Sequence, residues 1–183
     1  MINRLKQAVQ FADALNRTVG QVSAWLIVGM TLATFATVVL RYVFGLGWIW
    51  LQETVLYMHG SLLMLAAGYT LLAGGHVRVD IFYRDWSEER KARVDIIGAI
   101  FLLLPVCLLI LIKGLPYVFD SFGTLEGSPQ PGGLPILFLF KAILILMPLL
   151  LLLQGFSQAA RSYLFLKGEM SRLAEDDTSS THD

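Results

Sequence analysis

Residues 134–160 read LPILFLFKAILILMPLLLLLQGFSQAA, and Lys141 is the single charged residue in this stretch. The hydrocarbon core of a bilayer is roughly 30 Å thick and needs about 20 apolar residues in a helix to cross it. The stretch is long enough. Its apolar residues run continuously, whereas those of a barrel strand would alternate with polar ones. It therefore predicts a membrane-spanning helix.

Three further stretches have the same character. Residues 18–40 and 96–112 contain no charged residue, and residues 54–75 contain no Asp, Glu, Lys or Arg and a single histidine, His59. The whole chain of 183 residues is 56% hydrophobic and 15% charged, with a mean hydropathy of +0.64. Soluble domains carry about 25% charged residues. We therefore expect an all-α integral membrane protein with four transmembrane helices, and exclude an ordinary soluble domain and a disordered chain.

Charge and cysteine content exclude several functions. Fourteen Lys and Arg balance fourteen Asp and Glu, so the chain has no overall basic field for nucleic acid. The single cysteine, Cys107, excludes a disulfide framework and a multi-cysteine metal site. The sequence also lacks a P-loop, a cluster of metal ligands and a Ser/His/Asp arrangement. We expect no enzyme, no catalytic residue, and no cofactor or metal held by this chain.

The basic residues predict an orientation. Cytoplasmic loops of membrane proteins are enriched in Lys and Arg. Eleven basic residues flank one side of the four spans, whereas Arg41 and Lys113 flank the other, with Lys141 nearby. Both termini and the loop between the second and third spans should therefore be cytoplasmic. The eleven residues are Arg4, Lys6, Arg17, Arg78, Arg84, Arg90, Lys91, Arg93, Arg161, Lys167 and Arg172.

The chain divides into three parts. Residues 1–17 are amphipathic, and either lie as an interfacial helix on the cytoplasmic leaflet or extend the first span as a helix. Residues 18–168 form the four-span membrane domain. Residues 169–183 form an acidic cytoplasmic tail, which we expect to be disordered. Pro105 should kink the third span, and a helix starting near Glu88 should run straight into it.

Two ionisable residues lie inside the spans. His59 could serve as an axial haem ligand, or could be a neutral imidazole bonded to a neighbouring helix. His76 is seventeen residues further along the same helix, roughly 26 Å away, so the two cannot clasp one haem, and the hydrogen-bonded reading is favoured. Lys141 could extend its ammonium to the outer headgroups or pair with Glu53 or Glu126. The extended arrangement is slightly favoured.

The connection between the first two spans is apolar and aromatic. Trp48 and Trp50 lie between Arg41 and Glu53, which could pair with each other at the outer side of the membrane. The sequence therefore predicts an anchoring or partner-contact cluster of Arg41, Trp50 and Glu53. Glycine and alanine stripes in the first two spans predict close contacts between helices.

Several short motifs together resemble one family. They are residues 41–44 (RYVF) followed by Trp50 and Glu53, residues 75–80 (GHVRVD), and residues 131–135 (PGGLP) followed by Lys141. Their order on four spans is similar to that in the small DctQ-type membrane subunit of TRAP transporters, the tripartite ATP-independent periplasmic transporters. The family often has two adjacent acids where this chain has Gln52 and Glu53. The anchoring residues that the resemblance indicates are Arg41, Trp50, Glu53, His76, Arg78, Asp80 and Lys141.

The resemblance implies partners and a function. A large membrane subunit would carry sodium and substrate, and a periplasmic solute-binding protein would deliver an organic acid, usually a carboxylate. This chain would be the small permease subunit in the bacterial inner membrane, in contact with lipid, and would scaffold the large subunit. Two alternatives from other classes are a stand-alone four-helix carrier and a haem-carrying electron-transfer subunit.

Overall fold

The structure, a computed structural model of the chain, describes residues 2–76 and 86–168, and every regular element in these ranges is helical. Four helical stretches are long and apolar enough to cross a membrane, which confirms the all-helical fold and the number of candidate spans. The elements are α1 (Ile2–Val43), α2 (Ile49–Leu65), α3 (Ala67–Leu72), α5 (Glu88–Gly98), the π-helical turn η1 (Ala99–Leu103), α6 (Leu104–Gly123) and α7 (Leu137–Leu166).

The amphipathic segment and the first span form one helix. α1 has 42 residues, which makes it about 63 Å long at a rise of 1.5 Å per residue. Its first turns pack against α7, and Val9 and Ala12 are only 3% and 0% exposed. The segment is continuous in helix with the first span, and whether it lies on the cytoplasmic leaflet stays a prediction. Part of its apolar side, Val9 and Ala12, is buried against protein, whereas Phe11 and Leu15 are exposed.

The second and third spans depart from the predicted boundaries. The second runs from Ile49 to Leu72, with a one-residue break at Ala66 between α2 and α3. The third is one helical stretch from Glu88 to Gly123, as expected for a helix that continues from the preceding loop. Its π-helical turn lies just before Pro105. Proline lacks an N–H and its ring clashes with the preceding turn, so the α-helical ladder is interrupted there.

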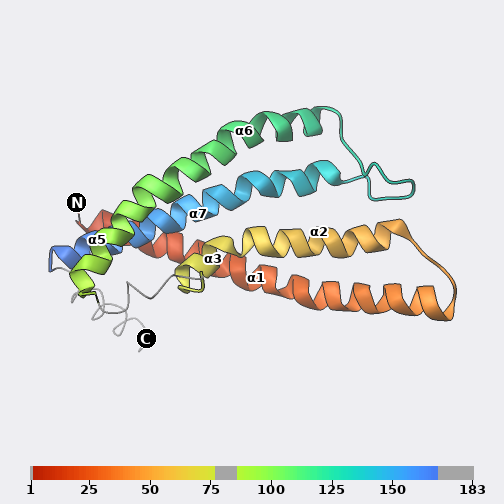
Figure 1. Cartoon of the computed structure of the whole chain (residues 1–183), viewed down its shortest axis with the longest axis horizontal. Helices are drawn as coiled ribbons and strands as arrows, with labels where there is room; N and C mark the ends of the chain where they lie inside the picture. The colour runs from red at the N-terminus through yellow and green to blue at the C-terminus, as the bar shows by residue number, and fades with distance from the viewer. Residues whose placement is uncertain (1, 77–85, 169–183) are drawn as a thin grey trace.

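The helices run up and down beside one another. Figure 1 shows α7 between α6 on one side and α1 with α2 on the other. The first turns of α1 and the last turns of α7 lie together, and we call this the terminal end. The connections 44–48 and 124–136 lie at the opposite end, which we call the loop end. α7 starts at Leu137 and ends at Leu166, a few residues later at both ends than the apolar run predicts.

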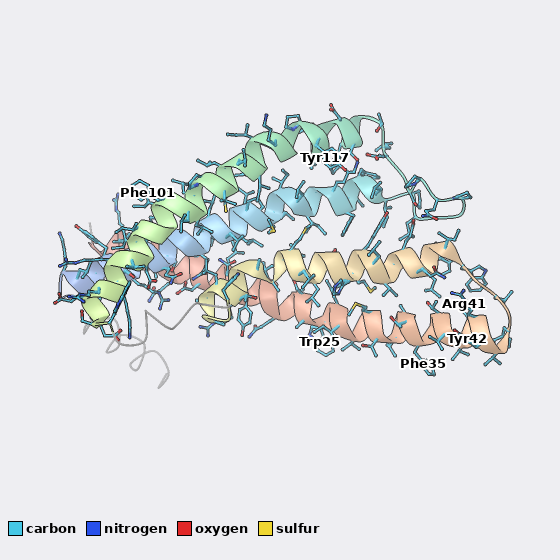
Figure 2. All side chains as sticks on the ribbon, viewed as in Figure 1. Trp25, Phe35, Arg41, Tyr42, Phe101 and Tyr117 are labelled. Carbon is cyan, nitrogen blue, oxygen red and sulfur yellow. The ribbon has the colours of Figure 1, made fainter. Side chains whose placement is uncertain are left out.

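Large apolar side chains cover the outside of the bundle. Trp25 and Phe35 project from the side of α1 that is turned away from α2, and they are 75% and 67% exposed (Figure 2). Phe101 is 70% exposed on η1. A soluble protein rarely exposes apolar patches of this extent. Such a surface suits lipid tails or the helices of another membrane protein.

Candidate functional site

Glu53 of α2 holds the connection between α6 and α7 at the loop end. Its carboxylate accepts a hydrogen bond from the hydroxyl of Ser128, and one from the backbone N–H of Leu134 at 2.7 Å. The Ser128 N–H donates to the Leu134 carbonyl at 2.8 Å, which closes the loop on itself. A Cβ on Gly133 would lie 2.5 Å from the Ser128 hydroxyl oxygen and 2.6 Å from a Glu53 oxygen, so the close approach needs glycine.

Lys141 of α7 forms an ion pair with Glu126 of the same connection. The Ser121 hydroxyl donates to the same carboxylate at 2.7 Å, and the Lys141 ammonium lies 4.1 Å from the centre of the Tyr117 ring. The hydrogen bond from Lys141, followed by the one from Ser121, lowers the pKa of Glu126 below its ordinary value. The Lys141 side chain is only 12% exposed. The favoured extension toward headgroups was therefore wrong, and the pair with Glu126 is the arrangement found.

The predicted pair between Arg41 and Glu53 is also wrong. Across residues 2–76 and 86–168 no ion pair joins them, because Ser128 and the Leu134 backbone occupy the Glu53 carboxylate. Arg41 is exposed at the end of α1. Trp50 stacks on Trp48 with ring centres 5.8 Å apart, and both indoles remain more than two-fifths exposed. The two tryptophans stack in the connection between α1 and α2, but Glu53 binds the connection between α6 and α7 instead of Arg41.

Of the remaining predicted anchoring residues, the described part of the chain includes His76. His76 follows α3 and is exposed. Arg78 and Asp80 lie outside the described residues, as does the acidic tail from residue 169. The anchoring role of these three side chains stays a prediction.

A second polar cluster, which the sequence analysis missed, joins α1 to α7 at the terminal end. One oxygen of Asp13 accepts hydrogen bonds from Ser157 at 2.7 Å and from Gln154 at 2.9 Å, and the other pairs with Arg161. The Asn16 amide donates to the Gln154 side chain at 3.0 Å. Asp13, Asn16, Gln154 and Ser157 are all at most 6% exposed. A buried polar network of this kind fixes how two helices meet, because each group depends on the others.

Asn16 brings α3 into the same cluster. Its amide nitrogen also donates to the carbonyl oxygens of Ala12 and Leu150, whereas its amide oxygen accepts no hydrogen bond within the described chain. A Cβ on Gly68 of α3 would overlap that oxygen and lie 3.2 Å from the Cβ of Leu150. The oxygen therefore lies against the glycine backbone, where a Cα–H can approach it. Gly68 lets three helices meet at one point.

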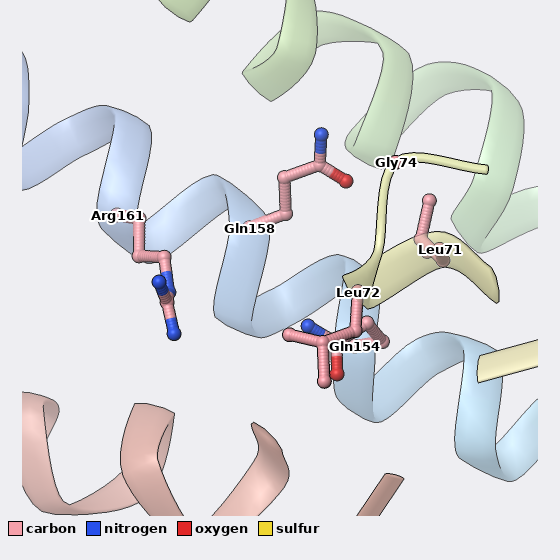
Figure 3. A pocket seen from close by; sticks show the side chains of 6 residues that line it. All are labelled: Leu71, Leu72, Gly74, Gln154, Gln158 and Arg161. Atoms are coloured by element: carbon pink, nitrogen blue, oxygen red, sulfur yellow. The ribbon is translucent and has the colours of Figure 1, made fainter. Parts of the chain in front are cut away.

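A small polar cavity borders this cluster between α3 and α7. Its volume is about 140 Å³. Figure 3 shows the Gln158 amide and the Arg161 guanidinium pointing to opposite sides, so their donors do not converge on one ligand. The cavity has room for a few water molecules, at about 30 Å³ each. It is lined by Leu71, Leu72, Gly74, Gln154, Gln158 and Arg161.

His59 differs from expectation. It lies near the middle of the second span, and it is exposed. No hydrogen bond joins it to a neighbouring helix in the described part of the chain, so the favoured hydrogen-bonded arrangement was wrong for this chain by itself. The contrast with Lys141 is clear, because Lys141 lies inside and paired while His59 faces outward.

A sequence signal for the missed cluster was present. Gln154, Ser157 and Arg161 follow one another at intervals of three and four residues, which places them on one face of α7. Asp13 and Asn16 have the same spacing on α1. Two polar faces at the same end of antiparallel helices indicate a contact.

Comparisons with known proteins identify the family. No curated protein and no solved structure matches the chain. The family model described as "Tripartite ATP-independent periplasmic transporters, DctQ component" matches residues 30–164, which is most of the chain. The match covers α2 through α6, the Glu53 and Lys141 contacts, and Gln154 and Ser157 of the terminal-end cluster. The chain is therefore a multi-pass membrane protein without enzymatic activity, and it belongs to the DctQ component family of TRAP transporters.

Proposed function

We propose that this chain is the small permease subunit that scaffolds a large TRAP membrane subunit during uptake of an organic acid. In this proposal the large subunit moves substrate and sodium, and a periplasmic binding protein delivers the acid, a carboxylate by the family resemblance. The membership of the chain in a tripartite family supports the presence of such partners. Its location would be the bacterial inner membrane.

The use of the polar side chains supports a scaffold over a carrier. Glu53 binds the connection between α6 and α7, and Lys141 pairs with Glu126 of that connection. Asp13 binds α7 at the terminal end. A site for sodium or a carboxylate needs several converging groups near the middle of the membrane. Glu53 and Asp13 instead join α2 and α1 to the α6–α7 half of the bundle, and the pair of Glu126 and Lys141 holds the α6–α7 connection on α7. That is the single observation on which the proposal depends most.

Orientation is part of the proposal. With both termini cytoplasmic, the loop end, with Ser128, would face the periplasm. Single cysteines at Ser128 and Ser180 in a Cys107→Ala background would test this with a membrane-impermeant thiol reagent on intact cells. We expect labelling of Ser128→Cys and protection of Ser180→Cys. The reverse pattern would contradict the orientation.

Reconstitution tests the function itself. We would compare liposomes containing this chain alone, this chain with the large subunit, and both with the binding protein. Sodium-driven uptake of an organic acid should require the full set. Robust uptake by this chain alone would overturn the scaffold proposal and favour the small carrier. A visible absorption band in the purified chain would instead favour the haem-carrying subunit.

A further inference from the structure

Apart from Trp50 in the first turn, the exposed residues of α2 form one stripe. Gln52, Leu56, His59 and Leu63 are all exposed, and they follow one another at intervals of four, three and four residues. This spacing keeps them on one face of a helix over three turns. Leu56 is 61% exposed and Leu63 is 60% exposed. We call these four residues the α2 stripe.

The other sides of α2 are occupied. The Tyr57 ring stacks on Phe140 of α7 with centres 4.6 Å apart. Met58 lies against Gly29 of α1, where its sulfur would be 3.4 Å from an added Cβ. Gly60 is also covered by the Phe140 ring. Because α2 contacts both α1 and α7 in this way, the α2 stripe faces out of the bundle.

Exposing the polar imidazole of His59 to lipid tails on such a face is energetically costly. His59 lies near the middle of the span Ile49–Leu72, about 15 Å from the first residue at 1.5 Å per residue. A neutral imidazole carries one N–H donor and one acceptor nitrogen. Lipid tails offer neither partner, and the described chain offers none. A ring on a single methylene group is also too short to reach the headgroups, unlike lysine.

Three exposed residues of α6 do not pose the same problem. Val106, Leu109 and Ile112 on α6 are 55%, 58% and 65% exposed, and all are aliphatic. Lipid tails can cover them without leaving a polar group unpaired. Ionisable residues in membrane spans generally face a bundle interior or a polar partner. The α2 stripe therefore needs a cover that these three residues do not, and the exposed Lys113 beside them has a stem long enough to carry its charge toward the headgroups.

We propose that the α2 stripe docks a transmembrane helix of the large subunit, which hydrogen-bonds His59 at mid-membrane depth. This inference rests on the proposed function and names the surface that carries it. The partner helix presents small or apolar residues to Leu56 and Leu63. Opposite His59 it carries a hydroxyl, amide or carboxyl group. Gln52, one turn from the start of α2, adds a second polar contact near the membrane surface.

Photo-crosslinking from the intact complex tests the location. A photoreactive residue would replace Leu56 or Leu63 on the stripe, and Leu109 or Ile112 on α6 as matched exposed positions. We expect adducts with the large subunit from the stripe positions and lipid adducts from α6. Adducts with the large subunit from α6 alone, or adducts between two copies of this chain from the stripe, would overturn the inference. If the unmodified chain does not recover the large subunit at all, it is the proposed function that fails.

Substitution of His59 tests the hydrogen bond. If lipid covered the stripe, His59→Leu would leave recovery of the large subunit unchanged or raise it, because an unpaired polar group is removed. We expect it instead to lower recovery about threefold to tenfold, in the range of polar contacts between membrane helices. His59→Gln keeps a donor and an acceptor and should retain most of the recovery. The yield and helix content of the small subunit should not change. Equal recovery for His59→Leu and the unmodified chain would refute the hydrogen bond.

Discussion

The backbone N–H of Leu134 donates a 2.7 Å hydrogen bond to the side chain of Glu53, eighty-one positions earlier in the chain. The bond fixes the connection between α6 and α7 onto the first turns of α2. A carboxylate bound to a backbone N–H forms one of the stronger types of hydrogen bond. The conformation of the connection between α6 and α7 therefore depends on a residue of α2.

Replacing Glu53 should release the loop without melting the helices. We expect Glu53→Ala to lower the free energy of unfolding in detergent by about 1–3 kcal/mol, because the Ser128 hydroxyl and Leu134 N–H lose their acceptor. Thermal unfolding and limited proteolysis within residues 124–136 would measure this. Glu53→Gln keeps one acceptor oxygen, so its free energy of unfolding should lie between those of the unmodified chain and Glu53→Ala. Unchanged proteolysis of Glu53→Ala would show that the loop holds itself.

The sequence predicts the spans but not the partners of their charged ends. Length and hydropathy are local properties, so four apolar helices follow from four apolar runs. Pairing depends on which side chains meet after packing. Arg41 and Glu53 flank one short connection and have opposite charges, yet Glu53 binds Ser128 across the bundle. His59 shows the same limit, because its exposure depends on how α2 is rotated against α1 and α7.

Replacing Asp13 and replacing Arg161 should lower the free energy of unfolding by different amounts. Asp13→Ala removes the buried charge and leaves a half-exposed Arg161, but it takes the acceptor away from Gln154 and Ser157, so it should lower the free energy of unfolding by about 1–3 kcal/mol. Arg161→Ala leaves the Asp13 carboxylate buried without its counter-charge, and should cost about 3–5 kcal/mol.

A double-mutant cycle in detergent would measure the coupling between Asp13 and Arg161. We expect the double variant to lose less than the sum of the single losses, because both remove the same contact. Asp13→Asn keeps the acceptor for Ser157 and serves as the conservative comparison. Strictly additive losses would mean that the ion pair contributes nothing to stability.

Glu126 should make the loop end sensitive to acid. Hydrogen bonds from Lys141 and Ser121 lower its pKa in the folded chain. A carboxyl group whose pKa falls on folding stabilises the folded state above its unfolded pKa of about 4.3, and this contribution is lost as pH falls through the folded value.

The unfolding midpoint of the unmodified chain should therefore drop more steeply below about pH 4.3 than that of Glu126→Gln. Near neutral pH the variant should be the less stable of the two, because the ion pair with Lys141 is missing. Parallel thermal unfolding curves at several pH values would compare them. Identical acid dependence in the two proteins would exclude Glu126 as a source of the effect.

Two helical glycines should respond in opposite ways to the same change. A Cβ at Gly68 would overlap the Asn16 amide oxygen and approach Leu150, so α3 would have to move away from α1 and α7. We expect Gly68→Ala to lower the free energy of unfolding by about 1–3 kcal/mol. At Gly98, at the end of α5, a Cβ would meet no atom within 4 Å. Gly98→Ala should be neutral or stabilise the chain by up to about 1 kcal/mol, because alanine favours helix.

Asn16→Ala tests whether Gly68→Ala lowers stability because its Cβ overlaps the Asn16 amide oxygen. Asn16→Ala removes the oxygen that a Cβ at position 68 would overlap, although it also removes the bond to Gln154. If that overlap is the cause, adding Gly68→Ala to Asn16→Ala should cost much less than adding it to the unmodified chain. Chemical unfolding of the four proteins in one detergent would give the comparison. The same cost in both backgrounds would place the strain at Leu150 rather than at the polar cluster.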